Sequence, residues 1–103
     1  MQYAKKVDKN QKEIVAALRA FGFSVESLHT IGKGIPDLLA GRDGYNYLVE
    51  VKDDKNTLTE PQQIFHANWR GRIWIIRTVS DAQSMYNYHI NYIRKIGELN
   101  GIR

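Results

Sequence analysis

The strongest constraint in this sequence is a two-residue turn, Asp43-Gly44, between two strand-like runs. Asp-Gly flanked by alternating apolar residues is a strong signal for a β-hairpin with a two-residue loop. Such a loop fixes which residues of the two strands face each other, counted outward from the turn. A bulge next to the turn would shift this register by one residue.

The hairpin register brings charged residues together. Asp37 falls directly opposite Glu50, and directly opposed residues point to the same face of a sheet. Lys52 lies two residues beyond Glu50 and shares that face. Burying unpaired charge in otherwise apolar strands is costly, and opposed carboxylates repel unless a proton or cation lies between them. The alternative is a surface ion pair of Lys52 with either carboxylate on a solvated face.

Oxygen donors gathered in this way suit a hard cation. The chain contains no cysteine, so disulfides and thiolate metal sites do not arise. Mg²⁺ or Mn²⁺ fits a pair of carboxylates and can hold a phosphate oxygen and water. Lys52 beside it could stabilise charge that develops on the phosphate. Asp37, Glu50 and Lys52 therefore indicate metal-assisted hydrolysis of a phosphodiester.

Periodicity and turn signals predict an α/β fold in a single domain spanning 1–103. Thr59-Glu60-Pro61-Gln62 matches a helix capping box with proline in the first turn. The expected elements, with approximate bounds, are a helix over 8–21, strands over 23–28, 38–40 and 45–52, a helix over 59–70, a central strand over 72–77 and a helix over 80–96.

Charge and apolar runs bound the partners. The formal net charge of +4 favours an anionic partner such as nucleic acid. No apolar run is long enough to span a membrane and no signal-peptide pattern is present, so we expect a cytoplasmic protein without a membrane partner.

Pro36-Asp37 followed by Glu50-Val51-Lys52 resembles the signature of the PD-(D/E)xK nuclease superfamily. The segment 32–38 (GKGIPDL) and the segment 58–62 (LTEPQ) with His66 are similar to its VRR-NUC branch. The resemblance covers about residues 8–82. It implies a restriction-endonuclease-like αβββαβ core with a mixed sheet flanked by helices, plus a C-terminal helix.

The same resemblance implies roles for individual residues. Asp37, Glu50 and the main-chain carbonyl of Val51 would hold Mg²⁺ or Mn²⁺, and Lys52 would be the catalytic lysine. A glutamate on the first helix often completes such a site, and Glu13 is the candidate here. The alternative is that Glu13 is solvated and pairs with a neighbouring lysine, which would be Lys9 or Lys12.

Gln62 combines two expectations, because it occupies the glutamine position of the capping box and the position of a family glutamine that faces the active site. His66 lies one turn further on the same helix face, where it either joins the site or packs as an ordinary histidine. His29 and His89 have no partner at metal-ligand spacing and are expected to be structural. Phe65, Trp69 and Trp74 are expected in the core.

The expected partner is DNA, and branched duplex such as a four-way (Holliday) junction is the preferred substrate by resemblance. Backbone contacts are expected from basic residues near the site and at the N-terminus: Lys5, Lys6, Lys9, Lys12, Lys33, Arg70 and Arg72. The last helix has apolar residues around most of its circumference, which predicts a homodimer.

The resemblance leaves other functions open. One is a general or exonucleolytic nuclease of the same superfamily, and another is a nucleic-acid-binding module without catalysis. Because stand-alone domains of this branch are common in phages and their hosts, the expected location is a bacterial or phage-infected cell.

Overall fold

The computed structural model describes residues 9–53 and 55–101. The elements in this part of the chain are α1 (Gln11–Ala20), β1 (Ser24–Ser27), β2 (Leu38–Arg42), β3 (Tyr45–Val51), α2 (Glu60–Asn68), β4 (Ile73–Ile76) and α3 (Val79–Leu99). Their order is the expected one of helix, three strands, helix, strand and helix. The predicted α/β class with a mixed sheet flanked by helices is confirmed.

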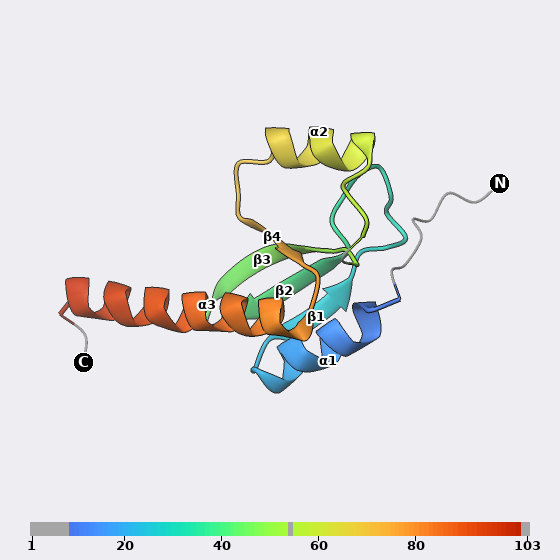
Figure 1. Cartoon of the computed structure of the whole chain (residues 1–103). Coiled ribbons are helices and arrows are strands. Elements are labelled where there is room, and N and C mark those ends of the chain that lie inside the picture. The colour runs from blue at the N-terminus through green and yellow to red at the C-terminus, as the bar shows by residue number, and fades with distance from the viewer. Residues whose placement is uncertain (1–8, 54, 102–103) are drawn as a thin grey trace.

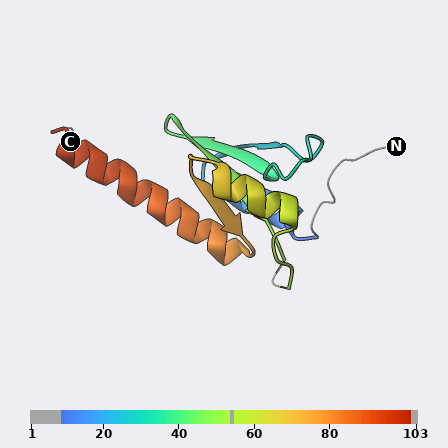
Figure 2. The ribbon, with the colours of Figure 1, turned by 90° about the horizontal axis from the view of Figure 1, so that it is seen from above.

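The strands form one sheet in the order β1-β2-β3-β4. β1, β2 and β3 pair antiparallel, and β4 runs parallel to β3 after a crossover through α2. Figures 1 and 2 show α1 and α3 against one face of this sheet and α2 over the other, which gives three layers. The site described below lies in the layer between the sheet and α2.

The predicted central position of the fourth strand is wrong. β4 is at the edge of the sheet among the residues that the structure describes. α3 packs against one of its faces, and Ile75 is 40% exposed. The apolar residues of β4 are explained by α3, which covers one face of the strand. An edge strand can be as apolar as a central one when a helix lies over it.

The Asp43-Gly44 hairpin forms as predicted. Its two residues have φ values of 54° and 81°, as a type I′ turn requires. Pairing continues without a bulge to Leu38, which faces Val49. One step further, the same register sets Asp37 opposite Glu50, at the end of the sheet where β2 begins.

The hydrophobic core lies between the sheet and the layer of α1 and α3. Ile14 and Leu18 of α1 are fully buried at the predicted i, i+4 spacing. α1 begins at Gln11 rather than at residue 8, which lies outside the described residues, and Gly22 follows its end with φ of 93°. The other buried apolar residues are Phe23, Val25, Leu38, Ala40, Tyr47, Val49, Val51, Ile76, Ala82 and Met85.

A chain of polar contacts connects the hairpin to α3. His89 is fully buried, with Nδ1 2.8 Å from the Tyr47 hydroxyl and Nε2 2.8 Å from Asp43 Oδ2. Burial raises the pKa of Tyr47, so the phenol stays protonated and its O–H donates a hydrogen bond to Nδ1. Nε2–H then donates to Asp43. His89 is structural, as predicted, and His29 lies in the loop after β1, 2.9 Å from the hydroxyl of Ser27.

α3 extends beyond the sheet. Figure 1 shows its C-terminal half leaving the rest of the molecule, and the helix is longer than predicted at both ends. Its buried residues, Ala82, Met85 and His89, all lie in the first half. In the described ranges no helix has the length and apolar character needed to cross a bilayer.

Candidate functional site: a buried acid pair beneath the second helix

Asp37 and Glu50 are both buried, with exposed fractions of 4% and 0%. The Asp37 carboxylate accepts a hydrogen bond from the main-chain N–H of Val51, at 2.8 Å from Oδ2. Asp37 directly precedes β2, so this hydrogen bond ties the start of β2 to the end of β3. The predicted meeting of the two acids is therefore built by the hairpin register and fixed by the backbone of β3.

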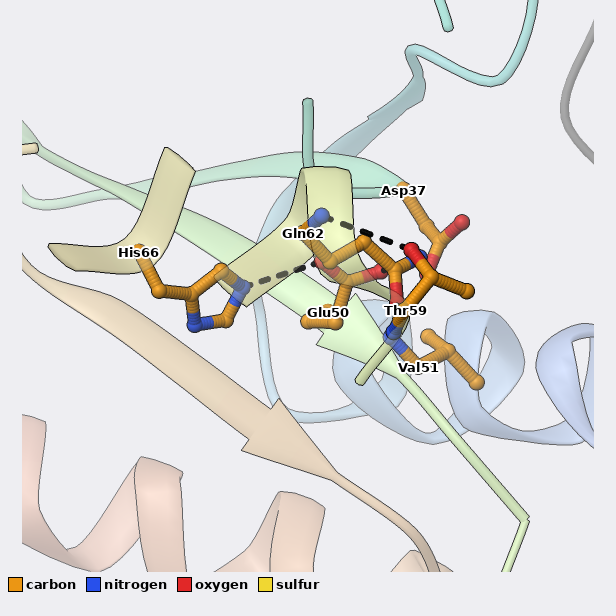
Figure 3. A network of polar contacts seen from close by, with 6 residues as sticks. All are labelled: Asp37, Glu50, Val51, Thr59, Gln62 and His66. Atoms are coloured by element: carbon orange, nitrogen blue, oxygen red, sulfur yellow. Dashed lines mark hydrogen bonds and ion pairs between the residues drawn. The ribbon is translucent and has the colours of Figure 1, made fainter. Parts of the chain in front are cut away.

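Glu50 lies under α2, which supplies a donor to each of its carboxylate oxygens. Gln62 Nε2 donates to Oε2 at 3.3 Å, and His66 Nε2 lies 3.0 Å from Oε1. Figure 3 shows these side chains converging between the helix and the sheet. Gln62 and His66 are one helical turn apart and face the same way. The alternative left open by the sequence for His66 is thus resolved in favour of a contact with the acid pair.

Gln62 caps α2 and contacts Glu50 at the same time. The side-chain Oε1 of Gln62 accepts a hydrogen bond from the main-chain N–H of Thr59 at 2.9 Å, and the main-chain N–H of Gln62 donates to Thr59 Oγ1 at 3.4 Å. These bonds complete the predicted capping box. Because Nε2 remains available for Glu50, the start of α2 and the acid pair are positioned by one side chain.

His66 is neutral at neutral pH. The distance to Glu50 would suit an ion pair, but burial lowers the pKa of His66 below its ordinary value near 6.5, and the Lys52 cation lowers it further. We therefore assign the bond to an uncharged ring whose Nε2–H donates to the carboxylate. A neutral donor orients Glu50 and leaves its negative charge in place.

Lys52 follows β3 directly and is 7% exposed. Its N–H donates to the carbonyl of Ile76 at 3.1 Å, and its carbonyl accepts from Asn10 Nδ2 at 3.2 Å. Its cation also lowers the pKa of His66, after burial. Asn10 also donates to the carbonyl of Arg77, so the start of α1 is held at this end of the sheet.

Glu13 lies in the first turn of α1 and its side chain is exposed. Within the described ranges, no three His, Cys, Asp or Glu residues gather closely enough to form a metal-binding group. The structure thus brings Asp37 and Glu50 together without Glu13 as a third member. The ligand role of Glu13 stays a prediction.

The donor set itself fits a hard cation. Asp37, directly before β2, and Glu50, on the adjacent β3, supply carboxylate oxygens. In an extended strand the N–H and C=O of one residue point the same way, and Val51 directs its N–H at Asp37. The Val51 carbonyl therefore faces the same side. Oxygen donors of this kind are the ones that Mg²⁺ and Mn²⁺ prefer.

The glycine-rich segment before Asp37 packs against the start of α2. Gly32, Lys33 and Gly34 all have positive φ, at 71°, 58° and 77°. A Cβ at Gly34 would collide with the main-chain carbonyl of Pro61. This close approach requires glycine and holds the chain leading to Asp37 against the helix that carries Gln62.

The basic side chains expected to contact DNA are solvent-accessible where the structure describes them: Lys9, Lys12, Lys33, Arg70 and Arg72. Lys5 and Lys6 lie outside the described residues. Arg72 also donates to the Tyr88 hydroxyl at 2.7 Å and lies over the Tyr88 ring. That contact holds its guanidinium at the edge of the sheet beside β4.

The prediction that Trp69 belongs to the core is wrong. Its side chain is 49% exposed, while Trp74 packs against the core as expected. α2 ends at Asn68, and Trp69 has an extended backbone with ψ of 128°. Its indole therefore does not continue the buried face of the helix. Phe65, one turn earlier, is partly buried and stacks on Trp69.

Comparison of the chain with protein-family models, with curated proteins and with solved structures finds no match. The described residues form an α/β structure with a four-stranded mixed sheet and an acid pair buried beneath a helix. The function is therefore argued from that site.

Proposed function

We propose that this protein is a metal-dependent deoxyribonuclease of the PD-(D/E)xK type that hydrolyses phosphodiester bonds. The observation that carries the proposal is the burial of Asp37, directly before β2, and of Glu50 on β3, with Lys52 directly after β3. Two buried carboxylates are costly to hold together without a cation. A fold retains such a pair most readily when the pair has a chemical role.

Mg²⁺ or Mn²⁺ would be held by Asp37, Glu50 and the carbonyl of Val51, and Glu13 is proposed as a further ligand from the first helix. When bound, such an ion supplies Lewis-acid stabilisation of a phosphate oxygen and lowers the pKa of a bound water.

The chain's own residues orient the site. The Val51 N–H fixes the Asp37 carboxylate, and Gln62 and His66 each hold one oxygen of Glu50. Lys52 supplies a positive charge in a buried site, where its interaction with an anionic phosphate is stronger than in water. These contacts preorganise the carboxylates, so little rearrangement is needed when a phosphate arrives.

DNA is the proposed partner, and branched duplex, such as a four-way junction, is the proposed substrate. The net charge of +4 and the solvent-accessible basic residues support binding to a phosphate backbone. A homodimer through α3 belongs to the same proposal, because Tyr92 and Leu99 are exposed on the half of α3 that leaves the body. Two sites related by a two-fold axis would suit a symmetric junction.

A digest with Mg²⁺ tests the proposal by comparing a four-way junction, a flap, a linear duplex and a single strand. The expected result is Mg²⁺-dependent cutting, fastest on the junction. Equal cutting of linear duplex would leave the nuclease but remove the structure selectivity. Cutting of ends or single strands alone would favour the exonucleolytic alternative. Binding without cutting of any substrate would favour a non-catalytic module.

A further inference from the structure

A groove lies beside the acid pair, between α2 and the sheet. Its volume is about 470 Å³, within the size range of sites for small organic ligands. Its lining is mostly apolar and includes Ile31, Ile35, Leu39, Leu48, Phe65 and Trp69. An apolar groove that is open to solvent and lies next to a charged site suits a ligand with an apolar part and a charged part.

The floor of this groove continues the row of side chains that contains the acid pair. Leu39 is two residues from Asp37, and Leu48 is two residues from Glu50, so all four point to one face of the sheet. Leu39 and Leu48 are directly paired across the two strands. Two residues of a strand span about 6.6 Å. The groove therefore begins one row of side chains from the carboxylates.

One wall of the groove is aromatic. Phe65 and Trp69 stack with ring centroids 5.3 Å apart and an interplanar angle of 17°. Trp69 is 49% exposed, so much of the indole remains accessible. Gly71 makes room for it, since a Cβ there would lie 2.7 Å from the indole Nε1. The flat ring is thus packed in place beside the opening.

Two cations lie near the groove, together with the carboxylate of Glu60 in the adjoining cavity. Arg72 contributes to the lining, and Lys33 lines the adjoining cavity next to Phe65. Lys33 would attract a phosphate, while the guanidinium of Arg72 is held on Tyr88. A flat base would leave water for the leucine floor and the aromatic wall. Unpaired bases commonly bind proteins by stacking on aromatic side chains.

We propose that the groove takes one unpaired nucleobase of the DNA strand whose phosphate lies at the acid pair. This inference rests on the proposed nuclease function and names a feature of its substrate, a base unstacked from the duplex next to the cut. Fully paired duplex cannot present such a base without first paying the cost of unpairing.

The test compares three duplexes with the whole protein, using Ca²⁺ in place of Mg²⁺ and checking afterwards that the DNA is intact. One duplex carries a single bulged thymidine, one carries an abasic nucleotide at the same place, and one is fully paired. The bulged thymidine should bind about tenfold more tightly than its abasic counterpart. Equal affinity for these two duplexes would overturn the proposal.

Trp69→Ala should abolish that difference, and Gln63→Ala, on the helix that precedes Trp69, is the matched control. Gln63 is exposed and lines neither the groove nor the adjoining cavity, so its variant should keep the tenfold ratio. A ratio retained by Trp69→Ala would also overturn the proposal. If that variant does not fold, Leu39→Ala, at a 38% exposed floor position, carries the same expectation.

Cleavage of the same duplexes with Mg²⁺ separates this proposal from the nuclease itself. A protein that cuts DNA but ignores the base refutes the groove alone. A protein that prefers the base but cuts none of the duplexes refutes the nuclease alone.

Discussion

Gln62 connects Thr59 to Glu50 through a single side chain: Oε1 accepts from the Thr59 N–H at 2.9 Å, and Nε2 donates to Glu50 Oε2 at 3.3 Å. The start of α2 and the acid pair are therefore coupled. A change at this one position can separate the capping of the helix from the positioning of the carboxylate.

Gln62→Glu tests that coupling. Glutamate still closes a capping box, so the helix should be retained by circular dichroism. The new carboxylate faces Glu50, and the lost donor and added repulsion should lower the free energy of unfolding by about 1–3 kcal/mol without metal. Added Mg²⁺ should restore more stability to this variant than to the wild type, measured by denaturant titration.

The control for that variant is Gln83→Glu, which makes the same charge change at an exposed position of α3. Its effect should stay within about 0.5 kcal/mol. An equal loss in both variants would mean that net charge, rather than the contact with Glu50, sets the effect.

Two glycines with similar backbone angles separate strain from close packing. Gly34 and Gly44 have φ of 77° and 81°, but a Cβ would meet the Pro61 backbone only at Gly34 and nothing within 4 Å at Gly44. Gly44→Ala should cost about 1–2 kcal/mol from the left-handed conformation alone. Gly34→Ala should cost clearly more by thermal unfolding, because the start of α2 must move. Equal costs would contradict the packing described for this loop.

His66 makes the stability of the metal-free protein depend on pH. Burial lowers the pKa of His66 in the folded protein below the ordinary value near 6.5. As the pH falls from about 6.5 towards this lower pKa, the unfolded chain takes up a proton that the folded protein does not, so stability decreases. His66→Gln should flatten this decrease in unfolding experiments between pH 5 and 7.

Above about pH 7.5 His66 is neutral in both the folded and the unfolded protein. The difference in stability between His66→Gln and the wild type should therefore no longer change with pH. A wild-type protein whose stability rises on acidification through pH 6 would contradict the assignment of a neutral, buried ring.

The sequence predicted those parts of the fold that short-range chemistry determines. The Asp43-Gly44 turn specified its own hairpin type, and the register followed from counting, which placed Asp37 opposite Glu50. The capping box at Thr59 likewise needs only four residues to identify. Each of these features depends on local backbone geometry, so the pattern of residue types is sufficient.

Features that depend on tertiary arrangement were harder to predict. The apolar residues of β4 do not reveal its edge position, because the same residues suit either a central strand or an edge strand that α3 covers on one face. Trp69 was assigned to the core because the helix was extended to Arg70. Its end at Asn68 turns the indole outward. The contact of His66 with Glu50 depends on how α2 crosses the sheet, for which the spacing from Gln62 was the one available signal.

The most direct test of the central claim is cleavage of a four-way junction with Mg²⁺ by the wild type, Lys52→Ala, Asp37→Asn and the control Lys55→Ala, with junction binding measured in parallel. Lys55 is exposed three residues beyond Lys52. We predict that both site variants lose at least about 100-fold in cleavage rate, that Lys52→Ala still binds the junction, and that Lys55→Ala cuts normally. Undiminished cleavage by Lys52→Ala and Asp37→Asn would contradict the proposed active site.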